Sequence, residues 1–258
     1  MEICALASGS SGNCFYLGNR KDSGILIDAG ITCKQIVERL EKIGKKPEKI
    51  KAMFITHEHS DHTRGADVFA RNFGVPIFAT KKTIKSRFLC SDEELINSIK
   101  NNETLQAAGL QIEAFSKSHL AEDPVSYNII NHKRVSVITD AGHACKNVVS
   151  NVSDADFLFL ESNYDELMLK NSFYPPHTKA WIKSDEGHLS NTQAGLCVLE
   201  HGSKKLKNVV LSHISINNNT EDIAFKTFNS LIKERKDLSP HVSLSNRMMP
   251  TRLFRMQG

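Results

Sequence analysis

Four potential metal ligands fall within six residues of one stretch, His57-Glu58-His59-Ser60-Asp61-His62. The apolar run Ala52-Met53-Phe54-Ile55 precedes this stretch and predicts a buried strand that opens into a polar loop. Imidazole and carboxylate ligands together suit zinc, manganese or iron, whereas calcium prefers oxygen ligands alone. The sequence therefore predicts a transition-metal site at the end of a strand.

This one loop has enough ligands for two ions. We expect His57 and His59 to bind one ion, and Asp61 and His62 to bind a second. Two divalent ions held that close can activate a water molecule and stabilise the negative charge that develops during hydrolysis. The simpler alternative is a polar surface loop that is rich in histidine, but further ligand candidates follow downstream.

Three more potential ligands stand at predicted strand ends. His119, Asp140 and His213 each follow an apolar run that is typical of a strand. Polar side chains at one edge of a rigid sheet can hold a metal with little strain. A single histidine after a strand would carry little weight, but four strand ends that present seven ligand-competent groups together predict a metal site.

Predicted strands and helices alternate along the chain. The expected strands are Ile3–Leu6, Cys14–Leu17, Ile25–Ile27, 52–55, Ile112–Phe115, Tyr127–Ile130, Val135–Thr139, Phe157–Leu160 and Val209–Ser212. The expected helices begin after Thr32, at Ala66, at Ser190-Asn191 and after Thr220, and the first three end at Gly44, Gly74 and Gly202. Two strand-rich halves that carry helices predict an α/β fold of two mixed sheets packed face to face with helices outside. Because no repeat or linker interrupts the chain, we expect a single domain over residues 1–258.

The composition favours a soluble, cytosolic protein over a membrane or secreted one. Hydrophobic residues make up 40% and charged residues 24% of the 258 positions, which is ordinary for a soluble globular chain. No apolar run approaches the roughly 18 residues that span a bilayer, and the first residues do not resemble a secretory signal. The 6 cysteines are scattered, which favours reduced thiols in a cytosolic protein. The formal charge of +4, with local lysine and arginine clusters, permits a nucleic-acid partner but does not establish one.

The ligand motifs also carry a family resemblance. Leu26–Gly30, Thr56–His62, His119, Thr139-Asp140 and Ser212-His213 resemble the motifs of the metallo-β-lactamase superfamily, over essentially the whole chain. Three further segments are similar to those of the YycJ (WalJ) group of that superfamily: Ser8–Cys14, Glu161–Asp165 and Gly187–Asn191. The resemblance implies an αβ/βα sandwich and a hydrolase with a binuclear metal site.

The resemblance also implies an assignment of ligands. One ion is expected on His57, His59 and His119, the other on Asp61, His62 and His213, with Asp140 bridging both. Asp28 lies in a matching structural motif, and we expect it to organise the ligand loop by hydrogen bonding. The chain departs from the group pattern after the third motif, where Leu120 and Ser126 replace an aspartate and a glycine.

His188 distinguishes between the chemistries of this superfamily, because the fold itself does not choose the substrate. Its place before His213 resembles that of an extra histidine in RNase Z-type phosphodiesterases, and Glu161 resembles that family's acidic partner of the histidine. A thioester or a lactone has a different leaving group and does not obviously need this pair. The alternative is that His188 only stands at the entry of the helix capped by Ser190. We take Asp61, His188 and Glu161 as the candidate catalytic residues.

Two sets of polar residues can each be interpreted in two ways. Ser8–Asn13 forms either a flexible connection between strands or a rim of small donors near the substrate. Asn163 and residues 217–219, all asparagines, have either turn roles or substrate roles.

The function that we predict is hydrolysis of a phosphodiester in nucleic acid by a cytosolic enzyme with two divalent ions, zinc or manganese or alternatively iron. The group resemblance favours DNA over RNA and implies a 5′-to-3′ exonuclease, without a membrane partner. One alternative is a small-molecule thioesterase or lactonase of the same fold. A further alternative is a non-catalytic, metal-bound regulatory protein.

Overall fold

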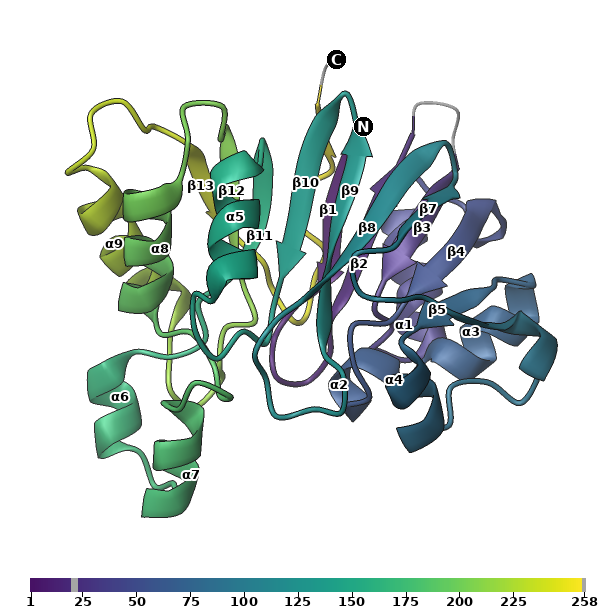
Figure 1. Ribbon diagram of the computed structural model, residues 1–258, viewed down its shortest axis with the longest axis horizontal. Helices are drawn as coiled ribbons and strands as arrows, with labels where there is room; N and C mark the ends of the chain where they lie inside the picture. The colour runs from purple at the N-terminus through teal and green to yellow at the C-terminus, as the bar shows by residue number, and fades with distance from the viewer. Residues whose placement is uncertain (20–22, 257–258) are drawn as a thin grey trace. The chain divides into compact units, whose positions relative to one another are not determined.

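The computed structural model describes residues 1–19 and 23–256. These residues form two compact units (Figure 1). The first unit comprises Met1–Ser116, Ala121–Lys133 and Asn246–Gly258, and the second comprises Lys117–Leu120 and Arg134–Ser245. The single domain over residues 1–258 stays a prediction, and each unit is described by itself.

The first unit contains a seven-stranded mixed sheet with the order β14-β1-β2-β3-β4-β5-β6. Its strands are β1 (Glu2–Ala7), β2 (Cys14–Gly18), β3 (Gly24–Ile27), β4 (Ile50–Phe54), β5 (Ile77–Ala79), β6 (Ile96–Ser98) and β14 (Phe254–Arg255). Strands β3 to β6 are parallel to one another, whereas β14, β1, β2 and β3 pair antiparallel. The parallel part matters for the site, because its strands end at the same edge of the sheet.

Three antiparallel strands of the first unit pack against this sheet. They are β7 (Thr104–Ala107), β8 (Leu110–Ser116) and β9 (Val125–Asn131). Tyr127 on β9 meets Phe54 on β4 edge to face, with ring centroids 5.5 Å apart. Its buried hydroxyl donates to the carbonyl of Ile55 at 2.9 Å. The face-to-face packing of strand layers expected from the sequence is therefore present in this unit.

The helices of the first unit are α1 (Cys33–Lys42), α2 (Ser60–Thr63), α3 (Ala66–Phe73) and α4 (Lys81–Ser86), with 3₁₀ turns at Pro47–Lys49 and Glu93–Leu95. Thr32 and Gln35 form the predicted capping box at the start of α1. Gly74 ends α3 in the left-handed conformation, with φ at 61°. The apolar faces of α1 and α3 pack into the core of the first sheet through Ile36, Leu40 and Phe69.

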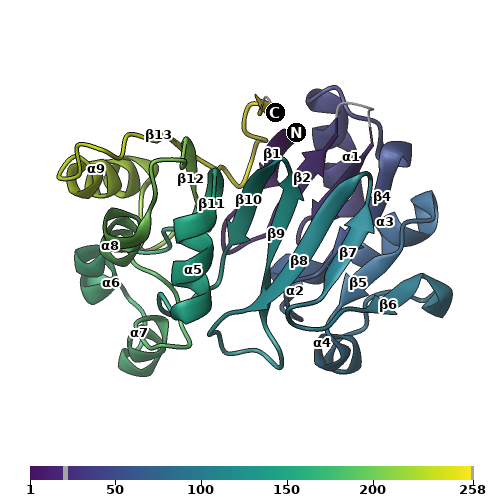
Figure 2. The same ribbon diagram turned by 45° about the horizontal axis from the view of Figure 1, so that its top comes forward.

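The second unit is built on four parallel strands in the order β13-β12-β11-β10. They are β10 (Lys133–Ile138), β11 (Phe157–Glu161), β12 (Asn208–Ser212) and β13 (His241–Leu244). Its helices are α5 (Lys146–Asp154), α6 (Glu166–Asn171), α7 (Pro176–Ile182), α8 (Asn191–His201) and α9 (Glu221–Ile232). Figure 2 shows α8 beside α9, and Figure 1 shows the short helices α6 and α7 together at the lower end of this unit.

The predicted strands and the four predicted helices are confirmed, with ends that shift by a few residues. Ser190 and Gln193 form a capping box before α8, and Thr220 caps α9. The structure adds one turn of helix, α2, inside the predicted polar loop, where Asp61 stands favourably in the first turn. None of the helices that the structure describes is both long enough and apolar enough to cross a membrane.

Candidate metal centre

The first unit collects its ligand candidates at the ends of two parallel strands. Ile27 at the end of β3 pairs with Phe54 at the end of β4. Asp28 therefore follows one strand beside Thr56 and His57, which follow the other. The sequence places apolar residues inside the sheet and polar residues immediately past its edge. That arrangement brings the polar side chains together.

Asp28 holds the ligand loop by hydrogen bonds, as expected. It is fully buried and adopts a left-handed backbone conformation, with φ at 60°. Its Oδ1 accepts from the backbone N–H of Thr56 at 2.8 Å, and its Oδ2 accepts from Nδ1 of His62 at 2.7 Å. Because an ionised carboxylate only accepts, the proton of His62 stays on Nδ1. Nε2 of His62 is then the atom with a lone pair for a metal.

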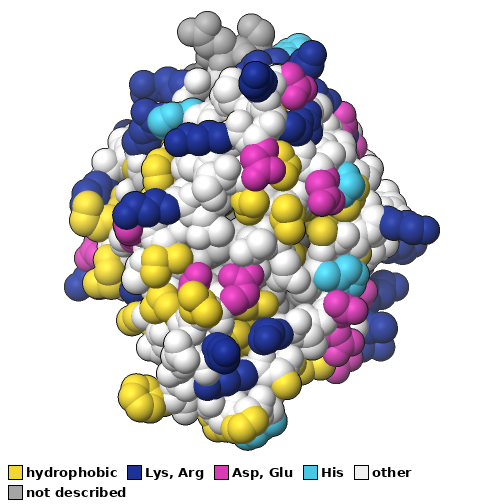
Figure 3. Space-filling view, turned by 90° about the vertical axis from the view of Figure 1, so that its left-hand side faces the viewer, with side chains coloured by type: hydrophobic (Ala, Val, Ile, Leu, Met, Phe, Trp, Pro, Cys, Tyr) yellow, Lys and Arg dark blue, Asp and Glu magenta, His cyan; other side chains and the backbone are white. Residues whose placement is uncertain are grey.

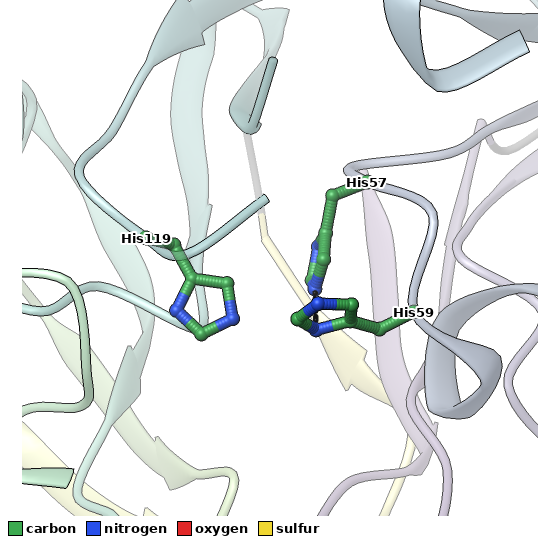
Figure 4. A group of neighbouring side chains, drawn as sticks. All are labelled: His57, His59 and His119. Atoms are coloured by element: carbon green, nitrogen blue, oxygen red, sulfur yellow. Dashed lines mark hydrogen bonds between the residues drawn. The ribbon is translucent and has the colours of Figure 1, made fainter. Parts of the chain in front are cut away.

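His57 and His59 point their ring nitrogens at one another (Figure 4). Nε2 of His57 lies 3.1 Å from Nδ1 of His59. Two nitrogens bound tetrahedrally to one zinc would lie roughly 3.4 Å apart, given metal–nitrogen bonds of about 2.0–2.1 Å. The hydroxyl of Thr56 contacts Nδ1 of His57 at 2.9 Å, on the other side of that ring. The pair has the spacing and the orientation of two ligands to one ion.

Asp61 and His62 form a second pair in this unit. Oδ2 of Asp61 lies 3.4 Å from Nε2 of His62. The buried side chain of Asn13 reaches the same place, with Nδ2 3.2 Å from Nε2 of His62 and 3.5 Å from Oδ2 of Asp61. Asn13 also bonds to Ser8 and Gly9. Ser8–Asn13 is thus a hydrogen-bonded turn that brings an amide to the ligand atoms.

The second unit presents its candidates at the carboxyl ends of three neighbouring parallel strands. Asp140 follows β10, Glu161 ends β11 and His213 follows β12. Asp140 and His213 both adopt the left-handed conformation, with φ at 52° and 56°. A non-glycine residue pays for this conformation and keeps it only where the surrounding contacts fix it, which is common at functional sites.

Asp140 and two histidines of the second unit have ligand-like spacing. Oδ1 of Asp140 lies 3.5 Å from Nε2 of His213 and 3.8 Å from Nε2 of His119. Nδ1 of His119, which Figure 4 also draws, donates to the carbonyl of Gly187 at 3.0 Å. Burial lowers the pKa of His119 to about 4, although Asp140 opposes the shift. His119 is therefore neutral near pH 7, which is the form that binds a metal.

Glu161 joins the two remaining histidines. Its Oε1 accepts from Nδ1 of His188 at 2.9 Å and from Nδ1 of His213 at 2.8 Å. Its Oε2 accepts from the backbone N–H groups of Ala141 and Leu189. Burial raises the pKa of Glu161, but the nearby His188 and the hydrogen bonds from His188 and His213 outweigh burial and bring the pKa to about 2. The sequence predicted the contact with His188 and missed the contact with His213.

The asparagines supply a buried network behind His213. Nδ2 of Asn163 donates to the carbonyl of His213 at 2.8 Å. Asn219 donates to the carbonyls of Ser162 and Asn163, and it exchanges hydrogen bonds with Asn191. Asn163 and Asn219 therefore hold the loop that carries His213. The exposed Asn217 instead donates to the hydroxyl of Tyr174 at 2.8 Å.

The residues in these two clusters are able to bind metal ions. Within the second unit alone, ligand atoms of Asp140, Glu161, His188 and His213 lie within 4.8 Å of one another. The donors are imidazoles and carboxylates, and the rings of His57, His62, His119, His188 and His213 each have a hydrogen-bond partner on Nδ1. That donor set fits zinc, manganese or iron better than calcium or magnesium.

Comparison with known proteins agrees with this chemistry. Residues 7–104 match the model of the family described as the metallo-β-lactamase superfamily. The chain is 36% identical over 228 residues to the exodeoxyribonuclease WalJ of Streptococcus pneumoniae, a match that covers 86% of this chain and 84% of the relative. The chain belongs to the WalJ/YycJ family of this superfamily. Within that family it is also 30% identical over 241 residues to the exodeoxyribonuclease YycJ of Bacillus anthracis, covering 91% and 90% of the two chains.

A solved structure supports the fold of this WalJ/YycJ family member. The metallo-β-lactamase fold protein YhfI from Bacillus subtilis matches 97% of this chain and 98% of its own, with a TM-score of 0.72 and 14% identity. The predicted fold class, an α/β sandwich of two mixed sheets flanked by helices, is thereby confirmed. The two departures from the group pattern differ in exposure: Leu120 is half exposed, whereas Ser126 is fully buried.

Two contributors to the ligand clusters were missed in the sequence. Thr56 links Asp28 to His57 through its hydroxyl, and Gly187 fixes His119 through its carbonyl. Thr56 directly precedes the histidine motif, so its position was a usable signal. A backbone carbonyl leaves no signal in residue types, so the role of Gly187 could not be found that way.

Proposed function

We propose that this protein is a metal-dependent phosphodiesterase that acts on nucleic acid, and most specifically a 5′-to-3′ DNA exonuclease. The observation that carries the proposal is the Glu161–His188 pair beside Asp140 and His213. Hydrolysis of a phosphodiester needs a group that meets the leaving oxygen or the phosphate, and an imidazole held by a buried carboxylate suits that role. The names of the WalJ and YycJ relatives support the substrate class.

The proposed ligand set combines residues from both halves of the sequence. We assign His57, His59 and His119 to one ion, Asp61, His62 and His213 to the other, and Asp140 to both. The cofactors would be two divalent ions, zinc or manganese, with iron as the alternative. The spacing within each cluster and the hydrogen bonds that orient the imidazoles support this assignment.

Bound ions would supply an activated water and would offset the negative charge of the phosphate. The residues of the chain do the rest. Glu161 keeps the Nδ1 proton of His188 in place and stabilises the charged imidazole, so that Nε2 can give a proton to the leaving oxygen or bind the phosphate. Asp61 joins the catalytic set because its carboxylate can accept a hydrogen bond from the water that is to react.

The test is incubation of purified protein with 5′- or 3′-labelled single- and double-stranded DNA and RNA, with zinc or manganese added. We expect cleavage of DNA, release of mononucleotides from the 5′ end, and activity that falls steeply as salt rises. Efficient hydrolysis of thioesters or lactones with every nucleic acid left intact would overturn the proposal and favour the alternative enzyme class.

We also propose a cytosolic setting for this activity. The six cysteines are free thiols, and four of them are buried. Free thiols persist in a reducing compartment, where structural disulfides are rare. Mass spectrometry of alkylated protein from cells checks this point, since cysteines paired in vivo would escape alkylation.

A further inference from the structure

Two short helices of the second unit form an arm with its own small core. We define the α6–α7 arm as residues 165–183, which contain α6 and α7. Leu169 and Ile182 pack with Tyr164, and Tyr174 and Trp181 cover them. Asp165 caps α6 through the backbone N–H groups of Leu167 and Met168. The arm is therefore a folded element rather than an irregular loop.

The surface of the arm combines exposed apolar groups with lysines. Phe173 is 106% exposed and Leu167 is 68% exposed, although both are large hydrophobic residues. Residues 165–183 carry three lysines, one aspartate and one glutamate, and the aspartate, Asp165, is the one that caps α6. The Nζ of Lys179 donates to the carbonyl of Lys170, which brings two of the lysines together. Figure 3 shows apolar side chains protruding beside lysine and arginine side chains at the lower end of this face, where α6 and α7 lie.

The arm is joined directly to the proposed catalytic histidine. The indole of Trp181 stands edge-on to the ring of His188, with centroids 5.5 Å apart and planes at 81°. The backbone N–H of His188 donates to the carbonyl of Ile182 at 3.0 Å. A side chain at Gly187 would meet the carbonyl oxygens of Trp181 and Ile182 at 2.3 Å, so only glycine permits this approach.

A second attachment fixes the other end of the arm. The hydroxyl of Tyr174 accepts from Nδ2 of Asn217 at 2.8 Å, and Asn217 lies in the loop that follows His213. Phe173 immediately precedes Tyr174 in the chain. The residue next to Phe173 is thus attached to the segment that follows a proposed ligand.

We propose that the α6–α7 arm binds the single-stranded part of a nucleic-acid substrate, with a base stacked on Phe173 and phosphates near Lys170 and Lys183. The inference rests on the proposed function and adds a substrate-binding element to it. Isolated exposed aromatic rings among lysines suit single strands, because every base offers a face for stacking and every nucleotide adds a negative charge. Continuity with His188 gives the bound strand a path toward the reacting phosphate.

The test measures how tightly the metal-loaded protein binds a fluorescent oligothymidine of 20 nucleotides. The oligonucleotide has phosphorothioate linkages, which resist cleavage. Phe173→Ala should weaken binding by about 5- to 150-fold, the range for loss of one base–aromatic stack. Phe173→Tyr should restore most of the affinity. Lys170→Ala with Lys183→Ala should weaken binding and make it less dependent on salt. Matched controls are Phe88→Ala, an exposed phenylalanine of the first unit, and Lys226→Ala on α9, and both should bind like the parent.

The outcomes separate this inference from the proposed function. If the parent cleaves DNA and Phe173→Ala binds the oligonucleotide like the parent, the arm is not the binding element. If the parent binds through Phe173 but cleaves no nucleic acid, the arm stands and the proposed function fails. If the parent binds vesicles of phosphatidylglycerol and phosphatidylcholine through Phe173 but not the oligonucleotide, the arm is a lipid-binding surface and the inference is wrong.

Discussion

Most of the histidines in the two clusters have a hydrogen-bond partner on Nδ1. The partner is Asp28 for His62, the carbonyl of Gly187 for His119, and Glu161 for both His188 and His213. Such partners fix the tautomer and the orientation of a ligand, and a preorganised ring costs less to bring to a metal. At the residue scale, this pattern favours the proposed metal site over a chance gathering of histidines.

The first prediction separates a ligand from a catalytic side chain. His59→Ala should lose metal and activity together, because its imidazole is proposed to bind an ion. His188→Ala should keep metal content near that of the parent and lower the cleavage rate by roughly 10²–10⁴-fold, the range for a lost general acid. Elemental analysis beside single-turnover cleavage of one DNA substrate measures both. Loss of metal from His188→Ala would instead make His188 a ligand.

The second prediction concerns Glu161, whose two oxygens each accept two hydrogen bonds. Glu161→Gln turns one of those oxygens into an NH₂ donor, which then faces two other donors inside the protein. Because one of the imidazoles affected belongs to His213, we expect a 10- to 100-fold loss of metal affinity as well as slower cleavage. Titration with zinc against a chelating dye gives the affinity. An affinity equal to that of the parent would show that Glu161 does not position His213.

At the scale of elements, the site depends on where parallel strands stop. Asp28, Asp140 and His213 each lie just past the end of a strand and adopt a left-handed backbone conformation. The side chains of these residues contact groups at the ends of neighbouring strands: Asp28 contacts Thr56, Asp140 lies 3.5 Å from His213, and His213 contacts Glu161. Each of these residues therefore carries a backbone cost, in exchange for a fixed side-chain direction.

The third prediction measures that cost at His213. Both His213→Gly and His213→Ala remove the imidazole, but glycine adopts a φ of 56° without the penalty that alanine meets. Metal-free His213→Gly should therefore be more stable than metal-free His213→Ala by about 1–2 kcal/mol. Urea unfolding gives the difference in the free energy of unfolding. Asn102, in an exposed turn with φ at 61°, is the matched control, and the same pair of substitutions there should have the same sign.

At the scale of the whole molecule, local signals made part of this structure predictable. The capping boxes at Thr32 and Ser190 and the apolar runs before His57 and His213 lie within a few residues of the features that they predict. Five short strands were missed, β5, β6, β7, β13 and β14, because runs of two to four residues are too short to show a repeating apolar pattern. The sharing of Glu161 by His188 and His213 also depends on contacts between residues far apart in the sequence.

The last prediction uses the stability of the whole chain to test the proposed metal centre. An ion that binds only the folded chain raises the free energy of unfolding by about 2.7 kcal/mol at a concentration 100 times its Kd. For a chain of this size that corresponds to a rise in melting temperature of roughly 5–10 °C. Calorimetry with zinc or manganese added to chelator-treated protein should show this rise in the parent and in His188→Ala, but a smaller rise or none in His59→Ala. A rise in His59→Ala equal to that of the parent would mean that the stabilising ions bind elsewhere, because the proposed ligand set cannot lose an imidazole and keep its full affinity.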